Sequence, residues 1–420
     1  MRILLVNKFY YLRGGAERSV FDTERMLRAE GHEVIPFAMS DERNRPSLRE
    51  RYFVDKVEFN REHSLREKLE IIPRVIYFRQ ARRRLERLLR REQVDLAHLH
   101  NIAHQISPSI LDSLKKFGIP VVQTLHDYKL ICPTYTMLAD GKVCERCSGG
   151  RYYHAAAQRC NKGSLAATLL NVVEMYVHRA LGLYDHGIDL FIAPSQFLRQ
   201  KLLQAGIRGT PIVHLPNAID ARHYLPHYGG KGFCVYFGRL SPEKGVDILI
   251  RSMRGQENLR LLIIGDGLQR QKLEDLVRTE KLDNVEFLGP LYGEDLKKVV
   301  ADALFVVLPS QCYENCPFSI LESFAMGKPV IGSNIGGIPE LISPGRDGLL
   351  VEPGDVDALR SQMRHLVENR ESTIEMGRLA RQKIENKYSP AAHLKGLMGA
   401  YQMAVGRSLS SSAGRDGERG

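Results

Sequence analysis

Short apolar runs rich in valine, isoleucine and leucine recur along the chain and alternate with stretches of helical spacing. Runs of about four to eight such residues, bounded by turn residues, are typical of strands buried on both faces of a sheet. Repetition of strand, helix and strand indicates a parallel sheet that helices cover on both sides. The first group of expected strands comprises Arg2–Val6, Val34–Met39, Val94–His100, Pro120–His126 and Asp189–Pro194.

The same alternation starts again after the turn-rich segment Pro226–Gly232. A chain of 420 residues, 43% of them hydrophobic, is long enough for two domains, since one domain usually takes about 100 to 200 residues. We therefore expect an α/β protein with two Rossmann-like, doubly wound domains. The second group of expected strands comprises Phe233–Phe237, Leu261–Ile264, Val285–Leu288, Leu304–Leu308 and Pro329–Gly332.

The expected domain limits follow from this division. An N-terminal domain takes residues 1–218, and a C-terminal domain takes residues 219–386. A helix is expected over 387–407. Residues 408–420 are rich in serine, glycine and charge, so we expect a disordered tail there.

An insertion at about 128–184 interrupts the regular alternation of the first domain. Long excursions inside a compact domain usually have a function or a structural staple of their own. One C-x2-C pair is present, and four thiolates suit a tetrahedral structural zinc site. Ligand spacing elsewhere is irregular, so free thiols or a disulfide remain alternatives. The four cysteines of the insertion are Cys132, Cys144, Cys147 and Cys160.

The formal net charge of +11 predicts an anionic partner, which a nucleotide, a nucleic acid or a membrane surface would satisfy. Seven arginines crowd one segment, 79–91, in which apolar residues recur at helical spacing. Two interpretations remain open, a solvated helix that packs its leucines on the first domain and a helix that contacts an anionic membrane. The arginines are Arg79, Arg82, Arg83, Arg84, Arg87, Arg90 and Arg91.

Neither a membrane-spanning run nor a basic leader is visible in the sequence, because Met1 leads directly into the apolar run Ile3–Val6. We expect a cytoplasmic protein, with the inner face of the membrane as a peripheral location. No zinc-finger, ribonucleoprotein or helix-turn-helix pattern accompanies the charge, which argues against nucleic acid as a partner.

Two loops at expected strand ends have the chemistry of phosphate binding. Gly14 and Gly15 stand directly before an expected helix, where backbone N–H groups and the helix dipole favour an anion or a sugar hydroxyl. In the second half, Arg239 and Lys244 follow the strand Phe233–Phe237. An arginine fork and a lysine point charge together can neutralise most of a diphosphate without a metal.

Two carboxylates, Glu314 and Glu322, lie eight residues apart after the strand Leu304–Leu308. Proline prefers the first turn of a helix, so Pro317 places Glu314 in the preceding loop and Glu322 on the helix. The free N–H groups of the next two residues then point at a phosphate between the carboxylates. Those residues are Phe318 and Ser319.

The run from Glu314 to Glu322 resembles the E-x7-E motif of the family-4 (group 1) retaining glycosyltransferases. The segments 238–245, 265–267, 327–330 and 336–340 are similar to further motifs of that family, in the same order. The resemblance implies the GT-B fold, in which two Rossmann-like domains face each other across a cleft. It covers nearly the whole chain.

The resemblance also implies roles for single residues. Arg239 and Lys244 would bind the donor diphosphate, Glu322 the nucleotide ribose, and Glu314 the donor sugar. Gly14 and Gly15 would lie beside the phosphate and the acceptor, and Pro317, Phe318 and Ser319 would line the donor site. His126 ends an expected strand where the cleft would open, and we expect it to hydrogen-bond the transferred sugar.

The function expected from these features is transfer of a hexose-type sugar from a nucleotide-diphosphate sugar to a sugar or lipid-linked acceptor. The resemblance implies retention of configuration, with the leaving phosphate helping to deprotonate the acceptor, and a place in polysaccharide or glycoconjugate biosynthesis. Catalysis would rest on His126, Glu314, Arg239 and Lys244 and would need no cofactor. Alternatives are a nucleotide-sugar epimerase of the same fold and a nucleic-acid-binding protein.

Two local patterns change the details. Asn315, Cys316 and Pro317 follow Glu314 where many relatives have Gly-Phe-Gly, and this departure leaves the donor sugar open. The D-x-D pattern of Asp355 and Asp357 is typical of metal-dependent transferases. Because a helix follows directly, we interpret Asp355 as a helix N-cap and Asp357 as a favourable first-turn charge.

Overall fold

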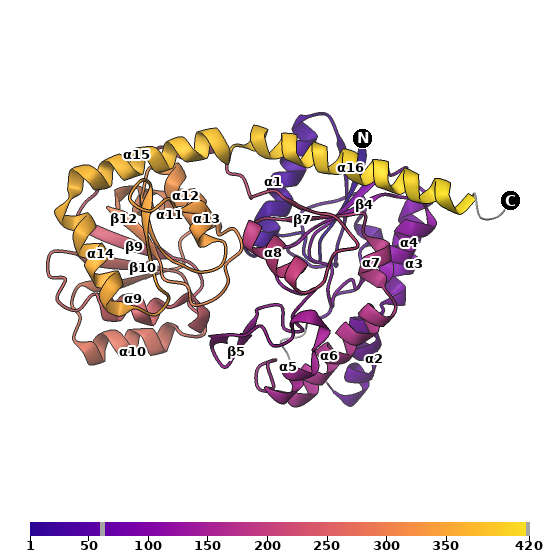
Figure 1. Ribbon diagram of the computed structural model, residues 1–420, viewed down its shortest axis with the longest axis horizontal. Coiled ribbons are helices and arrows are strands. Elements are labelled where there is room, and N and C mark those ends of the chain that lie inside the picture. The colour runs from indigo at the N-terminus through magenta and orange to yellow at the C-terminus, as the bar shows by residue number, and fades with distance from the viewer. Residues whose placement is uncertain (59–63, 417–420) are drawn as a thin grey trace.

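The computed structural model describes residues 1–58 and 64–416, which form two α/β domains (Figure 1). The first domain is built on a six-stranded parallel sheet of order β2-β1-β3-β4-β7-β8. The last strand of this sheet was not expected from the sequence. The strands are β1 Arg2–Val6, β2 Glu33–Phe37, β3 Leu96–Leu99, β4 Val121–Thr124, β7 Leu190–Ala193 and β8 Ile212–His214.

The second domain repeats this design with a six-stranded parallel sheet of order β11-β10-β9-β12-β13-β14. All five expected strands are present, and an unexpected sixth strand closes the edge. The strands are β9 Phe233–Phe237, β10 Arg260–Ile264, β11 Val285–Gly289, β12 Phe305–Leu308, β13 Val330–Ser333 and β14 Gly348–Val351. The predicted fold class, two doubly wound Rossmann-like domains, is confirmed.

Helices connect the strands and cover both sheets (Figure 1). The first domain contains α1 Gly15–Ala29, α2 Leu65–Ile76, α3 Arg79–Leu89, α4 Ser109–Lys116 and α8 Gln196–Gln204. The second contains α9 Val246–Ser252, α10 Arg270–Glu280, α11 Gly293–Asp302, α12 Phe318–Ala325, α13 Ile338–Leu341, α14 Val356–Glu368 and α15 Arg370–Lys387. Asp355 is the N-cap of α14, as predicted, and its carboxylate accepts a hydrogen bond from the N–H of Ala358 at 2.8 Å.

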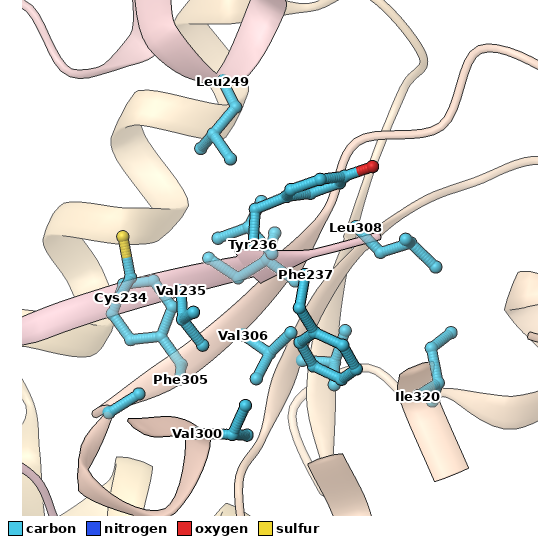
Figure 2. Close-up of a cluster of buried hydrophobic side chains, with 14 of the residues drawn as sticks. Cys234, Val235, Tyr236, Phe237, Leu249, Val300, Phe305, Val306, Leu308 and Ile320 are labelled. Carbon is cyan, nitrogen blue, oxygen red and sulfur yellow. The ribbon is translucent and has the colours of Figure 1, made fainter. Parts of the chain in front are cut away.

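The core of the second domain explains why the sequences of its central strands are continuously apolar. Every residue of β9 is buried, because helices cover both faces of this central strand. Figure 2 shows side chains of β9 and β12 packing with Leu249 of α9 and Ile320 of α12. This packing fixes the ends of β9 and β12, where the loops with Arg239 and Glu314 begin.

The last helix, α16 Pro390–Asp416, crosses from the second domain back to the first (Figure 1). Four of its side chains, spaced for one helix face, pack against apolar residues of β1, β4 and β7. The helix includes residues 408–416, which belong to the segment expected to be a disordered tail, and residues 417–420 lie outside the described part. The four packed side chains are Leu397, Ala400, Tyr401 and Ala404.

The insertion folds into a small hairpin and a group of helices. The hairpin pairs β5 Leu138–Ala139 with β6 Lys142–Val143, and the helices are α5 Tyr153–Ala157, α6 Leu165–Ala180 and α7 Leu183–Gly187. A small cluster of Cys147, Tyr152, Ala155, Val172 and Met175 joins α5 to α6.

The zinc site predicted for the insertion finds no support. Within residues 1–58 and 64–416, no group of three or more His, Cys, Asp or Glu is placed to hold a metal ion. The thiols of Cys132, Cys144, Cys147 and Cys160 are free, and two of them are buried as packing residues.

The basic helix α3 turns its leucines inward. Ala81, Leu85 and Leu88 are fully buried against the first domain, while Arg83 and Arg87 point to solvent. This arrangement agrees with the interpretation as a solvated helix and leaves membrane contact untested. Among the described residues, we find no helix that combines the length and apolar character needed to span a bilayer.

Candidate active site

The two sheets turn their carboxyl ends toward a common cleft. In open parallel sheets, ligands bind at the carboxyl ends of two neighbouring strands whose following helices lie on opposite faces of the sheet. In the second sheet this point lies between β9 and β12, and in the first it lies between β1 and β3. The loops at these positions contain Arg239 and Lys244, Glu314, and the glycine pair Gly14 and Gly15.

A cleft of about 590 Å³ lies between the two domains. Its volume falls within the range of about 300 to 1,000 Å³ that is usual for small-molecule sites. The structure brings every residue predicted for donor binding or catalysis together in its wall. These residues are Gly14, Gly15, His126, Arg239, Lys244, Glu314, Pro317, Phe318, Ser319 and Glu322.

Lys244 and Glu314 form a buried ion pair in this wall, with Lys244 Nζ 2.5 Å from Glu314 Oε1. Ser310 Oγ donates to the same carboxylate oxygen at 2.7 Å. Burial by itself raises the pKa of Glu314, but the charge and hydrogen bond of Lys244, together with Ser310 and Arg239, lower the pKa below its ordinary value. Burial lowers the pKa of Lys244, but Glu314 and Cys312 together raise it above its ordinary value. Both groups are therefore charged at neutral pH.

The glycine pair Gly336 and Gly337 fixes the backbone beside this ion pair. Gly337 N–H donates to the Glu314 carbonyl oxygen at 2.7 Å. Gly336 has a φ of +61°, and a Cβ there would lie 2.5 Å from the same carbonyl oxygen. A side chain at position 336 would therefore displace Glu314. The two segments, expected to be separate motifs in the sequence, form one wall.

Arg239 lies at the exposed edge of the cleft, at the end of β9. The hydroxyl of Tyr236 donates to the Arg239 carbonyl oxygen at 2.8 Å, which holds the backbone of the loop. Its guanidinium has no ion-pair partner among the described residues. It is thus available to an anion that enters between the domains.

The N-terminus of α12 faces Gly15 across the cleft. Pro317 is the N-cap of this helix, so its first N–H groups, those of Phe318 and Ser319, are left without intrahelical partners. A Cβ on Gly15 would lie 3.4 Å from the ring of Phe318, so the two loops approach closely. The glycine turn before α1 and the start of α12 thus both line the cleft, and the free N–H groups of a helix N-terminus suit a phosphate.

Glu322 makes contacts that the sequence did not reveal. Its carboxylate accepts from the guanidinium of Arg18, which belongs to α1 in the other domain. The hydroxyl of Tyr224 donates to the same carboxylate at 3.2 Å and accepts from Arg18 at 2.7 Å. Arg18 also lies over the ring of Phe318 at 4.7 Å. The only sequence signal for Arg18 was its place one turn into the helix after Gly14 and Gly15.

Two further contacts hold the domains together beside the cleft. Asn315 Nδ2 donates to the carbonyl oxygen of Leu125 at 3.1 Å, and its Oδ1 accepts from Ser195 Oγ at 2.6 Å. The carboxylate of Glu340 accepts from the N–H groups of Gln196 and Phe197, at the start of α8, at 2.8 and 2.6 Å. The unusual Asn315 is therefore a bridge between domains.

His126 belongs to a row of three histidine side chains. Its Nε2 lies 2.8 Å from Nδ1 of His100, and the two rings stack with centroids 5.1 Å apart. His100 in turn lies against His98, whose ring nitrogens bond to the hydroxyls of Tyr401 and Thr124, each at 2.8 Å. The C-terminal helix α16 thus supports the histidine in the cleft.

Burial keeps this row neutral at physiological pH. It lowers the pKa of His126 to about 4, with a smaller effect from the nearby Lys8. It lowers the pKa of His98 to about 3 and that of His100 well below its ordinary value. A base so weak is poorly matched to proton abstraction near neutral pH. His126 is better suited to hydrogen bonding.

The hydrogen bond between His100 and His126 also determines which ring nitrogen of His126 is protonated. Nε2 of His100 is buried without a hydrogen-bond partner among the described residues. An unpaired buried N–H costs more than an unpaired acceptor, so the proton of His100 lies on Nδ1. It then donates to Nε2 of His126, whose own proton must lie on Nδ1. His126 therefore offers an N–H donor rather than a lone pair.

We expect the free energy of unfolding to fall as the pH is lowered from about 6.5 toward 4.5. The pKa values of His98, His100 and His126 are lowered in the folded protein, so the unfolded chain binds more protons in this window. Each histidine then contributes a slope of up to about 1.4 kcal/mol per pH unit. Denaturant unfolding at several pH values measures it. His98→Gln should flatten the slope by about one proton, and an unchanged slope would contradict the assignment.

The sequence models of two protein families match the chain. Residues 13–223 match the one described as Glycosyltransferase Family 4, and residues 219–383 match the one described as Glycosyl transferases group 1. The first match covers the domain with Gly14, Gly15 and His126, and the second covers the domain with Arg239, Lys244 and both carboxylates.

Curated relatives are similar over part or all of the chain. A GDP-mannose-dependent alpha-mannosyltransferase of Mycolicibacterium smegmatis is 26% identical over 97% of this chain and 98% of its own length. Sulfoquinovosyl transferase SQD2 of Arabidopsis thaliana is 28% identical over 55% of this chain and 46% of its own length. The chain aligns with about half the length of several curated relatives that it matches.

Solved structures share the arrangement of both domains. Sucrose-phosphate synthase from Thermosynechococcus elongatus aligns with a TM-score of 0.73 and 19% identity, over 96% of this chain and 98% of that chain. Anabaena HepE in complex with UDP aligns with a TM-score of 0.69 and 19% identity, over 96% of this chain and 100% of that chain. These likenesses show the fold.

Proposed function

The chain belongs to the group 1, or family 4, glycosyltransferases, and on that premise we propose that it transfers a hexose-type sugar from a nucleotide-diphosphate donor with retention of configuration. The acceptor is a sugar or a lipid-linked sugar. The proposed setting is polysaccharide or glycoconjugate biosynthesis in the cytoplasm.

The observation that supports this proposal most directly is the grouping of Arg239, Lys244 and the N-terminus of α12 around one end of the cleft. Two cations and a set of free N–H groups suit the two negative charges of a diphosphate. They would also stabilise the charge that develops on the leaving phosphate, which is how preorganised donors accelerate such reactions. No metal ion or other cofactor is needed for this role.

The remaining residues receive roles by their positions. Glu322 would accept hydrogen bonds from the ribose hydroxyls, and Glu314 would face the donor sugar beside Lys244. His126 would donate its Nδ1 proton to a sugar oxygen. The acceptor hydroxyl would lose its proton to the leaving phosphate, and the enzyme would act by positioning and charge stabilisation.

The donor is proposed from the relatives. Mannosyltransferases that depend on GDP-mannose are among the curated relatives, and the HepE structure contains UDP. A guanosine or uridine diphosphate sugar is therefore the first choice. An epimerase of the same fold would process such a donor without an acceptor, but the matched families are transferases.

A panel of nucleotide sugars tests the proposal. A donor that binds the folded protein raises its melting temperature by mass action, by about 2.7 kcal/mol in free energy at a hundredfold excess over Kd. We expect one nucleotide diphosphate and its sugar to stabilise the protein, and EDTA to leave the shift unchanged. Sugar transfer to a pool of acceptors is then followed with the same donor.

The alternatives predict different results. An epimerase would convert the donor to its epimer, or hydrolyse it, at full rate with no acceptor present. A nucleic-acid-binding protein would show no shift with any nucleotide sugar and a steep salt dependence of DNA or RNA binding. Either result would overturn the proposed transferase.

A further inference from the structure

Helix α6 of the insertion exposes an apolar stripe. Leu165, Leu169, Val173 and Tyr176 recur at helical spacing on one side and are each 37% to 46% exposed. The opposite side of α6 is buried. The exposed Tyr153 of α5 extends the stripe, because its N–H donates to the hydroxyl of Tyr176 at 3.3 Å. Contiguous exposed apolar side chains of this kind mark an interaction surface.

Within the segment 151–181, which forms this stripe, every exposed charge is positive. The segment 151–181 contains four lysine or arginine residues and a single acid, Glu174, which is fully buried and paired with Lys129. The cations are all exposed, and three of them have no carboxylate partner among the described residues. Those three are Arg151, Arg159 and Arg179. A partner that fits must offer both apolar contact and negative charge.

A row of adjoining cavities leads from the active-site cleft toward this face. A cavity of about 100 Å³ shares His126, Asp127 and Tyr135 with the cleft. A further cavity of about 160 Å³ shares Lys129 and Tyr184 with it. The second cavity is lined in part by Tyr152, the N-cap of α5, and by Met175 of α6.

We propose that the α5–α6 face docks on an anionic lipid membrane and presents the cleft to a membrane-anchored acceptor. Apolar side chains rimmed by lysine and arginine are the pattern of interfacial helices that lie in the headgroup region. Helices α2, α5 and α6 lie together along the lower edge of the first domain in Figure 1. Docking there leaves the donor-binding domain free. The acceptor part of this proposal rests on the proposed transferase function, whereas the docking itself does not.

Vesicle co-sedimentation tests the docking with the full-length protein. The probes are vesicles of phosphatidylglycerol and phosphatidylcholine, compared with vesicles of phosphatidylcholine alone. We expect binding to the anionic vesicles, weakened by high salt, and at least about tenfold weaker binding for the double variant Leu169→Glu with Val173→Glu. Both positions are on the surface, so the fold should tolerate the changes.

The matched control places two glutamates on exposed leucines of the second domain. Leu225 and Leu268 are 86% and 98% exposed, and Leu225→Glu with Leu268→Glu adds the same charge to the other domain. We expect this control to bind anionic vesicles about tenfold better than the α6 variant. Equal loss in both variants would mean that net charge alone governs binding, which overturns the α6 face as the docking site.

Further measurements separate the remaining outcomes. The proposal is overturned if the wild-type protein does not bind anionic vesicles. It is also overturned if the α6 variant binds them as tightly as the wild type does. A wild-type dimer that the α6 variant converts to monomer would assign the stripe to a second copy of the chain instead. The α6 variant should keep its thermal shift with the donor, so failure of docking and failure of the transferase function are distinguishable.

Discussion

Replacing Lys244 with alanine is expected to reduce kcat/KM by about a hundredfold to a thousandfold, the largest effect of any single change in the cleft. The variant loses a cation that would contact the diphosphate. It also leaves the buried carboxylate of Glu314 without its ion-pair partner, which lies 2.5 Å away in the wild type. Affinity for nucleoside diphosphates, measured by calorimetry, should fall with the activity.

Loss of folding stability has to be separated from loss of binding in this variant. Breaking a buried ion pair by removing one partner typically costs about 3 to 5 kcal/mol of stability. The double variant Lys244→Ala with Glu314→Gln also removes the unpaired carboxylate charge. Its melting temperature should therefore be close to that of the wild type. Its affinity for nucleoside diphosphate should stay low. Wild-type affinity in either variant would remove Lys244 from the donor site.

Glu322→Gln is expected to weaken donor binding by about tenfold to a hundredfold, the range of a hydrogen bond to a charged group. The substitution keeps the size of the side chain and removes the negative charge that Arg18 and Tyr224 contact. Affinity for the nucleoside diphosphate and KM for the donor sugar are the measurements. A variant with wild-type values would show that the carboxylate does not contact the ribose.

The matched control acts on the other side of the same ion pair. Arg18→Gln also breaks the contact between the domains, but it leaves the carboxylate of Glu322 in place. If Glu322 only holds the domains together, both variants should lose the same affinity. If it binds the ribose, Glu322→Gln should lose more, and its loss should disappear with ligands that lack the ribose.

The sequence by itself determined the features that depend on local pattern. Apolar runs predicted ten of the strands, because a strand buried on both faces must be apolar along its whole length. Asp355 was identified as a helix cap from its immediate neighbours, and α3 from its periodic leucines. The site residues Arg239, Lys244 and Glu314 lie at strand ends, which parallel sheets bring to one edge whatever the loop lengths.

Only the tertiary structure decided what depends on contacts between distant segments. The contact of Arg18 with Glu322 spans 304 residues, and that of His98 with Tyr401 spans 303, so no local spacing in the sequence predicts either contact. Three further features depend on such distant contacts. They are the return of α16 to the first domain, the bridge made by Asn315 and the absence of a metal-binding group in the described insertion. Hydrophobic periodicity shows that a face is apolar, but burial against a neighbour depends on the whole chain. Residues 165–180 have apolar side chains on more than one side of α6, and only the folded protein shows which of them are exposed.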